Sequence, residues 1–163
     1  EAGDSGPRID RHGHLAARRR EFAGVRQQVG HHLHQTVGVA ADGGKVVVTG
    51  VDQDGDVGKI YLGGADPYDG SGYTEIDIDS IVGSGGLGTW GRGACIQGDR
   101  IAVVGERQPL SSGTGLVMLS TDGGASFSDI TPSGVGESVT RCRFLPDGAL
   151  VVAGGDSFFG VYR

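Results

Sequence analysis

Three aspartates alternate with other residues in the segment Asp52-Gln-Asp54-Gly-Asp56, and this spacing suits a metal ion. Carboxylates at alternating positions can converge on a hard cation such as Ca²⁺, which prefers oxygen ligands. An EF-hand loop that began at Asp52 would need glycine at position 57 and glutamate at position 63, where the chain has valine and glycine. The segment is therefore not an EF-hand, and two interpretations remain: a looser calcium site formed by Asp52, Asp54 and Asp56, or a solvated acidic turn.

The histidines form a second group of candidate metal ligands. His31 and His34 are three residues apart, so both could reach one ion from the same face of a helix. No cysteine and no clear carboxylate partner lies nearby in the sequence. The alternative interpretation is an exposed polar helix face. All five histidines are in the first 36 residues: His12, His14, His31, His32 and His34.

Carboxylates and arginines raise the question of glycoside hydrolysis, which needs two carboxyl groups about 5–9 Å apart over a cleft. Glu75, Asp77 and Asp79 alternate along the chain and would share one face of a strand. We therefore expect a solvated strand face rather than an acid/base pair. Six arginines follow without a recognisable motif: Arg92, Arg100, Arg107, Arg141, Arg143 and Arg163. We predict no catalytic and no cofactor-binding residues.

The composition divides the chain near Val37. Residues 1–36 hold six of the 14 basic residues and only four acids, so this N-terminal arm is positive. Residues 37–163 hold 16 acids, eight basic residues and 28 of the 33 glycines. The net charge of −6 argues against a nucleic-acid partner, and no apolar run is long enough for a membrane-spanning helix. We expect a basic arm joined to an acidic, glycine-rich body.

The arm has the apolar spacing of a helix. Its large apolar residues fall on one face of a helix from about Gly13 to His34: Leu15, Phe22, Val25, Val29 and Leu33. Gly24 and Gly30 weaken such a helix by about 1 kcal/mol each relative to alanine. We therefore expect residues 1–36 to be either a marginal amphipathic helix or disordered.

Three segments of the body read as the same hairpin. Each has a short apolar strand, a tight turn and a β-branched strand that ends in glycine: residues 38–50, 93–105 and 142–154. Two-residue hairpin turns require positive φ angles, for which glycine is suited. We predict the turns at three dipeptides that contain glycine: Asp42-Gly43, Gln97-Gly98 and Asp147-Gly148.

Two further strands follow the hairpin in the first two repeats. Residues 58–62 match 115–119, and residues 73–76 match 127–130. The unit is therefore four short strands, and its closing glycine recurs after 55 and then 49 residues, a period typical of a β-propeller blade. We predict an all-β fold of tandem four-stranded antiparallel blades that form a partial β-propeller, at about 37–88, 89–138 and, incomplete, 139–163.

The two cysteines fall in the first strands of the second and third repeats. Cys95 and Cys142 are two positions out of register in this alignment. Only one intramolecular disulfide could form, and nothing in the sequence forces it. Two buried free thiols are the alternative, so the cysteines do not decide between a reducing and an oxidising compartment.

The turn that follows the third strand of the second repeat has a known pattern. The segment Ser120-Thr-Asp122-Gly-Gly124-Ala-Ser-Phe127 fits S/T-x-D-x-G-x-x-W/F. It resembles the Asp-box, or BNR repeat, of sialidases and of noncatalytic β-propellers such as photosystem II assembly factors. The resemblance implies a structural role: Asp122 accepts hydrogen bonds from turn amides, Gly124 takes a positive φ, Phe127 packs into the blade and Ser120 caps the turn.

The resemblance covers enzymes and noncatalytic modules alike, and the absence of catalytic motifs favours a noncatalytic interaction or scaffold module that binds a protein or a glycan. Two alternatives remain: a fragment of a sialidase-like glycoside hydrolase, and a structural repeat segment of a larger secreted or surface protein. A propeller needs about four or more blades. The incomplete third blade therefore predicts a fragment, closure by self-association, or another all-β arrangement such as a small sandwich. The family favours a secreted or periplasmic location.

Overall fold

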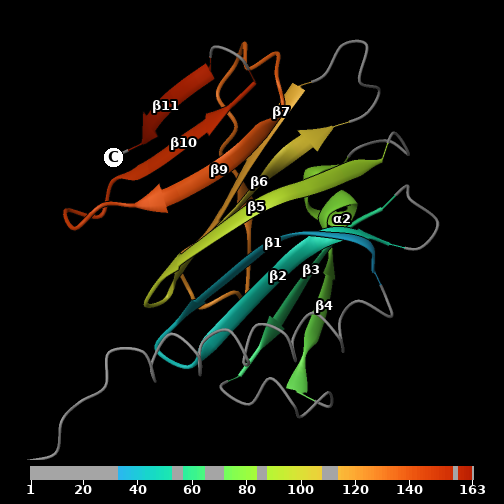
Figure 1. Cartoon of the computed structure of the whole chain (residues 1–163), viewed down its shortest axis with the longest axis vertical. Coiled ribbons are helices and arrows are strands. Elements are labelled where there is room, and N and C mark those ends of the chain that lie inside the picture. Colours follow the sequence, from blue (N-terminus) through green and yellow to red (C-terminus); the bar gives the residue numbers. More distant parts are fainter. Residues whose placement is uncertain are drawn as a thin grey trace, which may run out of the picture.

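The protein consists of three antiparallel sheets in which each strand pairs with the next strand along the chain (Figure 1). The computed structural model describes residues 33–52, 57–64, 72–83, 88–107, 114–155 and 158–162. The all-β prediction is confirmed at this level, as antiparallel sheets of up to four strands. The three described sheets do not close into a ring (Figure 1).

The strands follow the chain from one sheet to the next. The first sheet contains β1 to β4: Leu33–Asp42, Lys45–Asp52, Gly58–Gly63 and Thr74–Asp77. The second sheet contains β5 to β8: Thr89–Gln97, Arg100–Arg107, Thr114–Ser120 and Ser128–Asp129. The third sheet contains β9 to β11: Val139–Phe144, Leu150–Gly154 and Phe158–Tyr162. A short helix, α2 (Ile78–Val82), connects the first sheet to the second.

The repeat inferred from the sequence is a repeat of strand pairing. The glycine near the end of each second strand pairs with the corresponding residue of the third strand: Gly50 with Lys59, Gly105 with Leu116 and Gly154 with Phe158. The fourth strands also correspond, because Glu75 pairs with Tyr61 and Asp129 pairs with Met118. Tyr61 and Met118 each lie two residues beyond the residue that pairs with the glycine.

The hairpin turns differ from the prediction. The first two turns lie one residue later than expected, at Gly43-Gly44 and Gly98-Asp99. Gly43, Gly44 and Gly98 have φ angles of 55°, 82° and 58°, in the left-handed region that glycine enters most readily. Glycine was therefore correctly expected in both turns, but the predicted register was wrong by one residue.

The third turn is longer than a two-residue turn, so the prediction at Asp147-Gly148 is wrong. Phe144 pairs with Leu150, and the connection is closed by a hydrogen bond of 2.8 Å from Leu145 N to Ala149 O. This longer turn shifts β9 relative to the sequence alignment. As a result, Cys142 pairs with Val152, whereas Cys95 pairs with Ala102. Val152 lies two residues before Gly154, and Ala102 lies three residues before Gly105. The two cysteines are therefore one position out of register, not two.

The first strands of the three sheets lie side by side, with β5 between β1 and β9 (Figure 1). Each has an irregularity at the same place: around residue 37 in β1, 92 in β5 and 140 in β9. A Cβ atom on Gly38 would lie 2.8 Å from Gly93 Cα, and one on Gly93 would lie 2.8 Å from Thr140 O. Glycine at positions 38 and 93 therefore permits the close approach of the three backbones.

The second sheet is buried on both faces. Ile101, Val103, Leu116 and Met118 face the first sheet and belong to one cluster with Val47, Ile60 and Ile78. The residues between them, Ala102, Val104 and Val117, face the third sheet. They form a second cluster with residues in and near the third sheet: Val135, Val139, Phe144, Leu150 and Val152. Burial of both faces explains why β6 and β7 are continuous apolar runs rather than alternating patterns.

The N-terminal arm differs from the prediction where it meets the body. Strand β1 begins at Leu33, so Leu33 and His34 are in extended backbone and cannot end a helix. The body therefore begins before Val37, because the pairing of β1 with β2 recruits residues from the arm. Residues 1–32 lie outside the described residues, and the helix predicted from Gly13 onward stays a prediction there.

Candidate functional site

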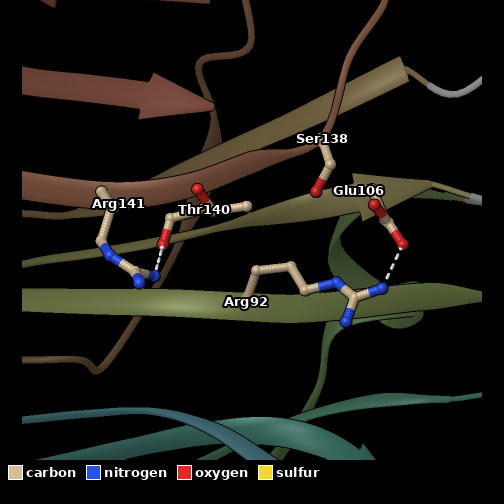
Figure 2. A pocket seen from close by; sticks show the side chains of 5 residues that line it. All are labelled: Arg92, Glu106, Ser138, Thr140 and Arg141. Carbon is tan, nitrogen blue, oxygen red and sulfur yellow. Dashed lines mark hydrogen bonds and ion pairs between the residues drawn. The ribbon is translucent and has the colours of Figure 1, made fainter. Parts of the chain in front are cut away.

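A groove crosses the side-by-side first strands, and we call it the first-strand groove. It comprises a cavity of about 370 Å³ and an adjoining one of about 170 Å³. Both cavities are lined by Arg92 from β5 and by Thr140 and Arg141 from β9. Glu106 and Ser138 complete the lining of the larger cavity (Figure 2). Gly38 and Val39 of β1 and Cys142 of β9 contribute to the smaller one.

Arg92 is held in the groove by two interactions. Its Nη2 donates to Glu106 Oε1 at 2.7 Å, and its guanidinium carbon lies 4.6 Å from the centre of the Trp90 ring. Glu106 is only 3% exposed, so its carboxylate requires a charged partner, and Arg92 supplies it. The guanidinium is therefore fixed on β5 at the irregularity that β5 shares with β1 and β9.

The β9 side of the groove presents hydrogen-bond donors. Arg141 is exposed, and its Nη1 donates to the backbone oxygen of Thr140 at 2.9 Å. Ser138 Oγ is buried and has no hydrogen-bond partner among the described residues. Figure 2 shows the side chains of Ser138, Thr140 and Arg92 around the same space. An acidic group placed there could accept hydrogen bonds from guanidinium and hydroxyl groups at once.

The residues of this groove were not among the sites expected from the sequence. Arg92 and Arg141 directly precede Gly93 and Cys142, which the repeat alignment matches, so the alignment puts the two arginines at the same position of successive repeats. That coincidence was the available signal. Glu106 and Ser138 carried no signal, because they reach the groove only through the pairing and packing of sheets.

The residues that resemble an Asp-box form a hydrogen-bonded turn between β7 and β8, which we call the Ser120 turn. Ser120 Oγ accepts from Gly124 N at 2.8 Å and donates to Asp122 Oδ1 at 2.8 Å. Asp122 also accepts from Ser126 N at 3.0 Å and from Ser126 Oγ at 2.6 Å. The hydrogen bonds from Ser126 and Ser120 lower the pKa of Asp122 to about 2 from an ordinary value of 3.8.

The Ser120 turn packs on its surroundings through its glycines and its aromatic residue. Gly124 has a φ of 97°, and a Cβ atom there would lie 2.3 Å from Leu62 of the first sheet. Gly123 N donates to Asp99 O at 2.8 Å. Phe127 packs against the cluster between the first two sheets. Asp99 is in the β5–β6 turn, so the Ser120 turn lies near the C-terminal end of β5, whereas Arg92 lies in the first half of that strand.

The predicted calcium ligands are only partly described. Asp52 ends β2, and its Oδ1 accepts from Val57 N at 3.4 Å. Asp54 and Asp56 lie outside the described residues. Within the described part of the chain, no three acidic, histidine or cysteine residues are grouped closely enough to hold a metal ion. The calcium site stays a prediction.

The histidine site is also a prediction for residues that are mostly not described. His12, His14, His31 and His32 lie outside the described ranges. His34 is in β1, so the helical spacing proposed for His31 and His34 does not apply at His34.

The three alternating acidic residues after position 74 do not lie on one strand, because β4 is followed directly by α2. Glu75 and Asp77 are in β4, but Asp79 is in α2, so the prediction that all three share one strand face is wrong. Glu75 lies 2.9 Å from Lys59 Nζ, and Asp77 forms a second ion pair with the same amine. The hydrogen bond from Lys59 lowers the pKa of Glu75, and the hydrogen bond to Asp77 raises the pKa of Lys59. Asp79 accepts a hydrogen bond from Thr89 Oγ1.

Comparison with known proteins does not assign a function to the groove. No protein-family model matches the chain, and no curated protein matches it. None of the helices in the described ranges is long and apolar enough to cross a membrane. The geometry of the sheets and of the first-strand groove is therefore the basis for a functional proposal.

Proposed function

We propose that the chain is a noncatalytic binding module, built from successive blades of an Asp-box-type β-propeller, that holds an acidic group of a protein or glycan partner in the first-strand groove. The observation that carries the proposal is the convergence of Arg92, Arg141 and the unpartnered Ser138 hydroxyl on one groove. Such a set of donors suits a carboxylate or sulfate group.

The blade interpretation is supported by the arrangement of the sheets. Each sheet is an antiparallel meander, and the three first strands lie together while later strands lie farther out (Figure 1). The hydrogen-bonded turn at Ser120, Asp122 and Gly124 adds a local feature that the Asp-box pattern implies. In a propeller, a groove along first strands would open toward the centre of the ring.

The binding interpretation is supported by the partners of the charged residues in the groove. Glu106 is the acidic residue that lines the larger cavity, and its carboxylate is already paired with Arg92 at 2.7 Å. Its role is therefore to position Arg92. Within the described part of the chain, Arg141 donates to the neutral backbone oxygen of Thr140 and forms no ion pair, so its positive charge stays available to a ligand.

The test is binding of acidic and neutral probes to the full chain. We expect a sulfated oligosaccharide, a sialylated oligosaccharide or an aspartate-rich peptide to bind, measured by calorimetry, and the matching neutral probes not to bind. Arg141→Ala should weaken binding roughly tenfold or more, since a hydrogen bond to a charged group contributes about 1.5–3 kcal/mol. Arg143→Ala is the matched control, because Arg143 is exposed on the same strand and does not line either cavity.

The outcomes separate the alternatives. Binding of the peptide but not the oligosaccharides identifies a protein partner, and the reverse identifies a glycan. Hydrolysis of the sialylated probe would overturn the noncatalytic proposal in favour of a sialidase-like enzyme. Equal binding of acidic and neutral probes, or equal effects of Arg141→Ala and Arg143→Ala, would remove the groove from the function and favour a structural repeat segment.

A further inference from the structure

The two cysteines, which the sequence places 47 positions apart, lie next to each other in the structure. Cys95 is in β5, where it pairs with Ala102. Cys142 is in β9, and its Sγ lies 3.8 Å from the backbone oxygen of that same Ala102. Both cysteines pack against the apolar cluster between the second and third sheets. Ala102 therefore brings the two cysteines together, because it pairs with Cys95 and contacts the sulfur of Cys142.

We propose that Cys95 and Cys142 are a modification site, a dithiol that oxidises to a reversible disulfide between the second and third sheets. Both cysteines are free in the structure described here. The neighbouring strands β5 and β9 carry them on backbones that are already in contact, so bond formation does not require the sheets to separate. This inference is independent of the ligand proposed for the first-strand groove.

The reaction is a thiol–disulfide exchange, and the oxidant is a small-molecule disulfide such as oxidised glutathione. One cysteine sulfur attacks the oxidant, releases one glutathione thiol and leaves a mixed disulfide. The second cysteine sulfur then attacks the first and releases the other glutathione thiol. Each cysteine loses its proton, and each glutathione sulfur gains one. The sulfur–sulfur bond of the oxidant is broken as the bond between Cys95 and Cys142 forms.

The position of Cys142 controls access and rate. Cys142 lines the smaller cavity of the first-strand groove, which provides a route for the oxidant. The hydrogen bond with Cys95, together with burial, raises the pKa of the Cys142 thiol. Because the thiolate is the reactive form, oxidation should be slow at neutral pH and should accelerate as the pH rises.

The disulfide should stabilise the protein because it restricts the unfolded chain. It would close a long loop that contains all of β6, β7 and β8. A loop of this length corresponds to an increase in melting temperature of roughly 5–15 °C. Reduction with dithiothreitol should reverse the increase.

The experiment is oxidation of the full chain with oxidised glutathione at mildly alkaline pH, followed by peptide mapping without reduction. We expect a monomeric product that contains the Cys95–Cys142 peptide pair, no free thiols and a raised melting temperature. Cys95→Ser and Cys142→Ser are matched controls that should each retain one thiol or carry one glutathione. Neither variant should gain melting temperature on oxidation. The peptide map of the unaltered chain decides the matter even if a variant fails to fold.

Three results would overturn the inference. They are retention of both thiols after prolonged oxidation, formation of intermolecular disulfides alone, and glutathione adducts on both cysteines without an internal bond. A disulfide that forms but lowers the melting temperature would contradict the claim that the native geometry already accommodates it.

Discussion

The Asp122 carboxylate is exposed, yet it holds a turn together through its hydrogen bonds. Ser126 donates to it twice, from its backbone N and its Oγ, and Ser120 donates once. All three donors are within four residues of Asp122, so the turn can assemble locally before the sheets pack. These bonds favour the ionised carboxylate, and this is why the pKa of Asp122 falls to about 2.

The lowered pKa predicts a pH-dependent contribution of Asp122 to stability. Since the folded pKa is about 2 and the ordinary value is 3.8, the contribution is complete above the ordinary value and is lost as the pH falls through about 2. Melting temperatures of the native chain and of Asp122→Ala should therefore differ most at neutral pH and converge in strong acid. A difference that stays constant over this range would contradict the hydrogen-bonded turn.

Ser126→Ala provides a second measurement at the same turn. Removing the Ser126 hydroxyl removes the largest cause of the low pKa, so the pKa of Asp122 should rise toward 3.8, measured by carboxyl-carbon NMR. Ser133→Ala is the control, because Ser133 is exposed in the next loop and is not a hydrogen-bond donor to Asp122. An unchanged pKa in Ser126→Ala would show that the hydroxyl does not hold the carboxylate.

At the scale of elements, glycines of β3, β6, β7 and β10 allow these strands to approach the entry to a first strand. A Cβ atom on Gly105 would lie 1.9 Å from Trp90 O, and one on Gly154 would lie 2.0 Å from Ser138 O. On the third strands, a Cβ atom on Gly58 would lie 2.7 Å from Thr89 O, and one on Gly115 would lie 2.5 Å from Glu137 O. The repeated glycines therefore mark places where two backbones are too close for any side chain.

Alanine at Gly105 or Gly154 should destabilise the protein by about 3 kcal/mol or more, because the added methyl group meets backbone that cannot move aside. Thermal unfolding would measure the change. Gly136→Ala is the matched control, since a Cβ atom on Gly136 meets nothing within 4 Å and its φ is not in the left-handed region. Similar melting temperatures for Gly105→Ala and Gly136→Ala would refute the close approach.

At the scale of the molecule, the three sheets form a stack with one fully covered member. The second sheet is covered on both faces, whereas the first and third are each covered by only one neighbouring sheet of the described chain. The third sheet also ends at β11, a strand that pairs only with β10 among the described strands. An edge strand with free backbone groups can pair with another chain.

The open edge predicts concentration-dependent self-association of the chain. Light scattering should report oligomers whose fraction grows with protein concentration. A lysine in β11, as in Phe159→Lys, should reduce association because a charge in an edge strand disfavours pairing. Ser133→Lys is the control, as it adds the same charge in an exposed loop. A monomer at all concentrations would refute association through this edge.

The strand content, the repeat and the hydrogen-bonded turn at Ser120 could be predicted from the sequence because each depends on residues close together in the chain. Apolar runs such as 101–104 define strands, and the bonds of the turn span only Ser120 to Ser126. Smaller local details were missed. The turn register was off by one residue, and α2 was not foreseen, although its apolar residues and the left-handed Gly83 that ends it fit a short helix.

The packing of sheets decided the rest. Arg92 and Arg141 line one groove, and Cys95 and Cys142 pack against one cluster, only because β5 and β9 lie side by side. Nothing in the local sequence specifies which strands become neighbours. The longer third turn moved Cys142 by one position, which the sequence alignment did not reveal. The chain by itself therefore determined the strands and their turns, since these arise from short-range sterics and hydrogen bonds. The groove and the thiol pair arise from long-range contacts that exist only after the sheets have packed.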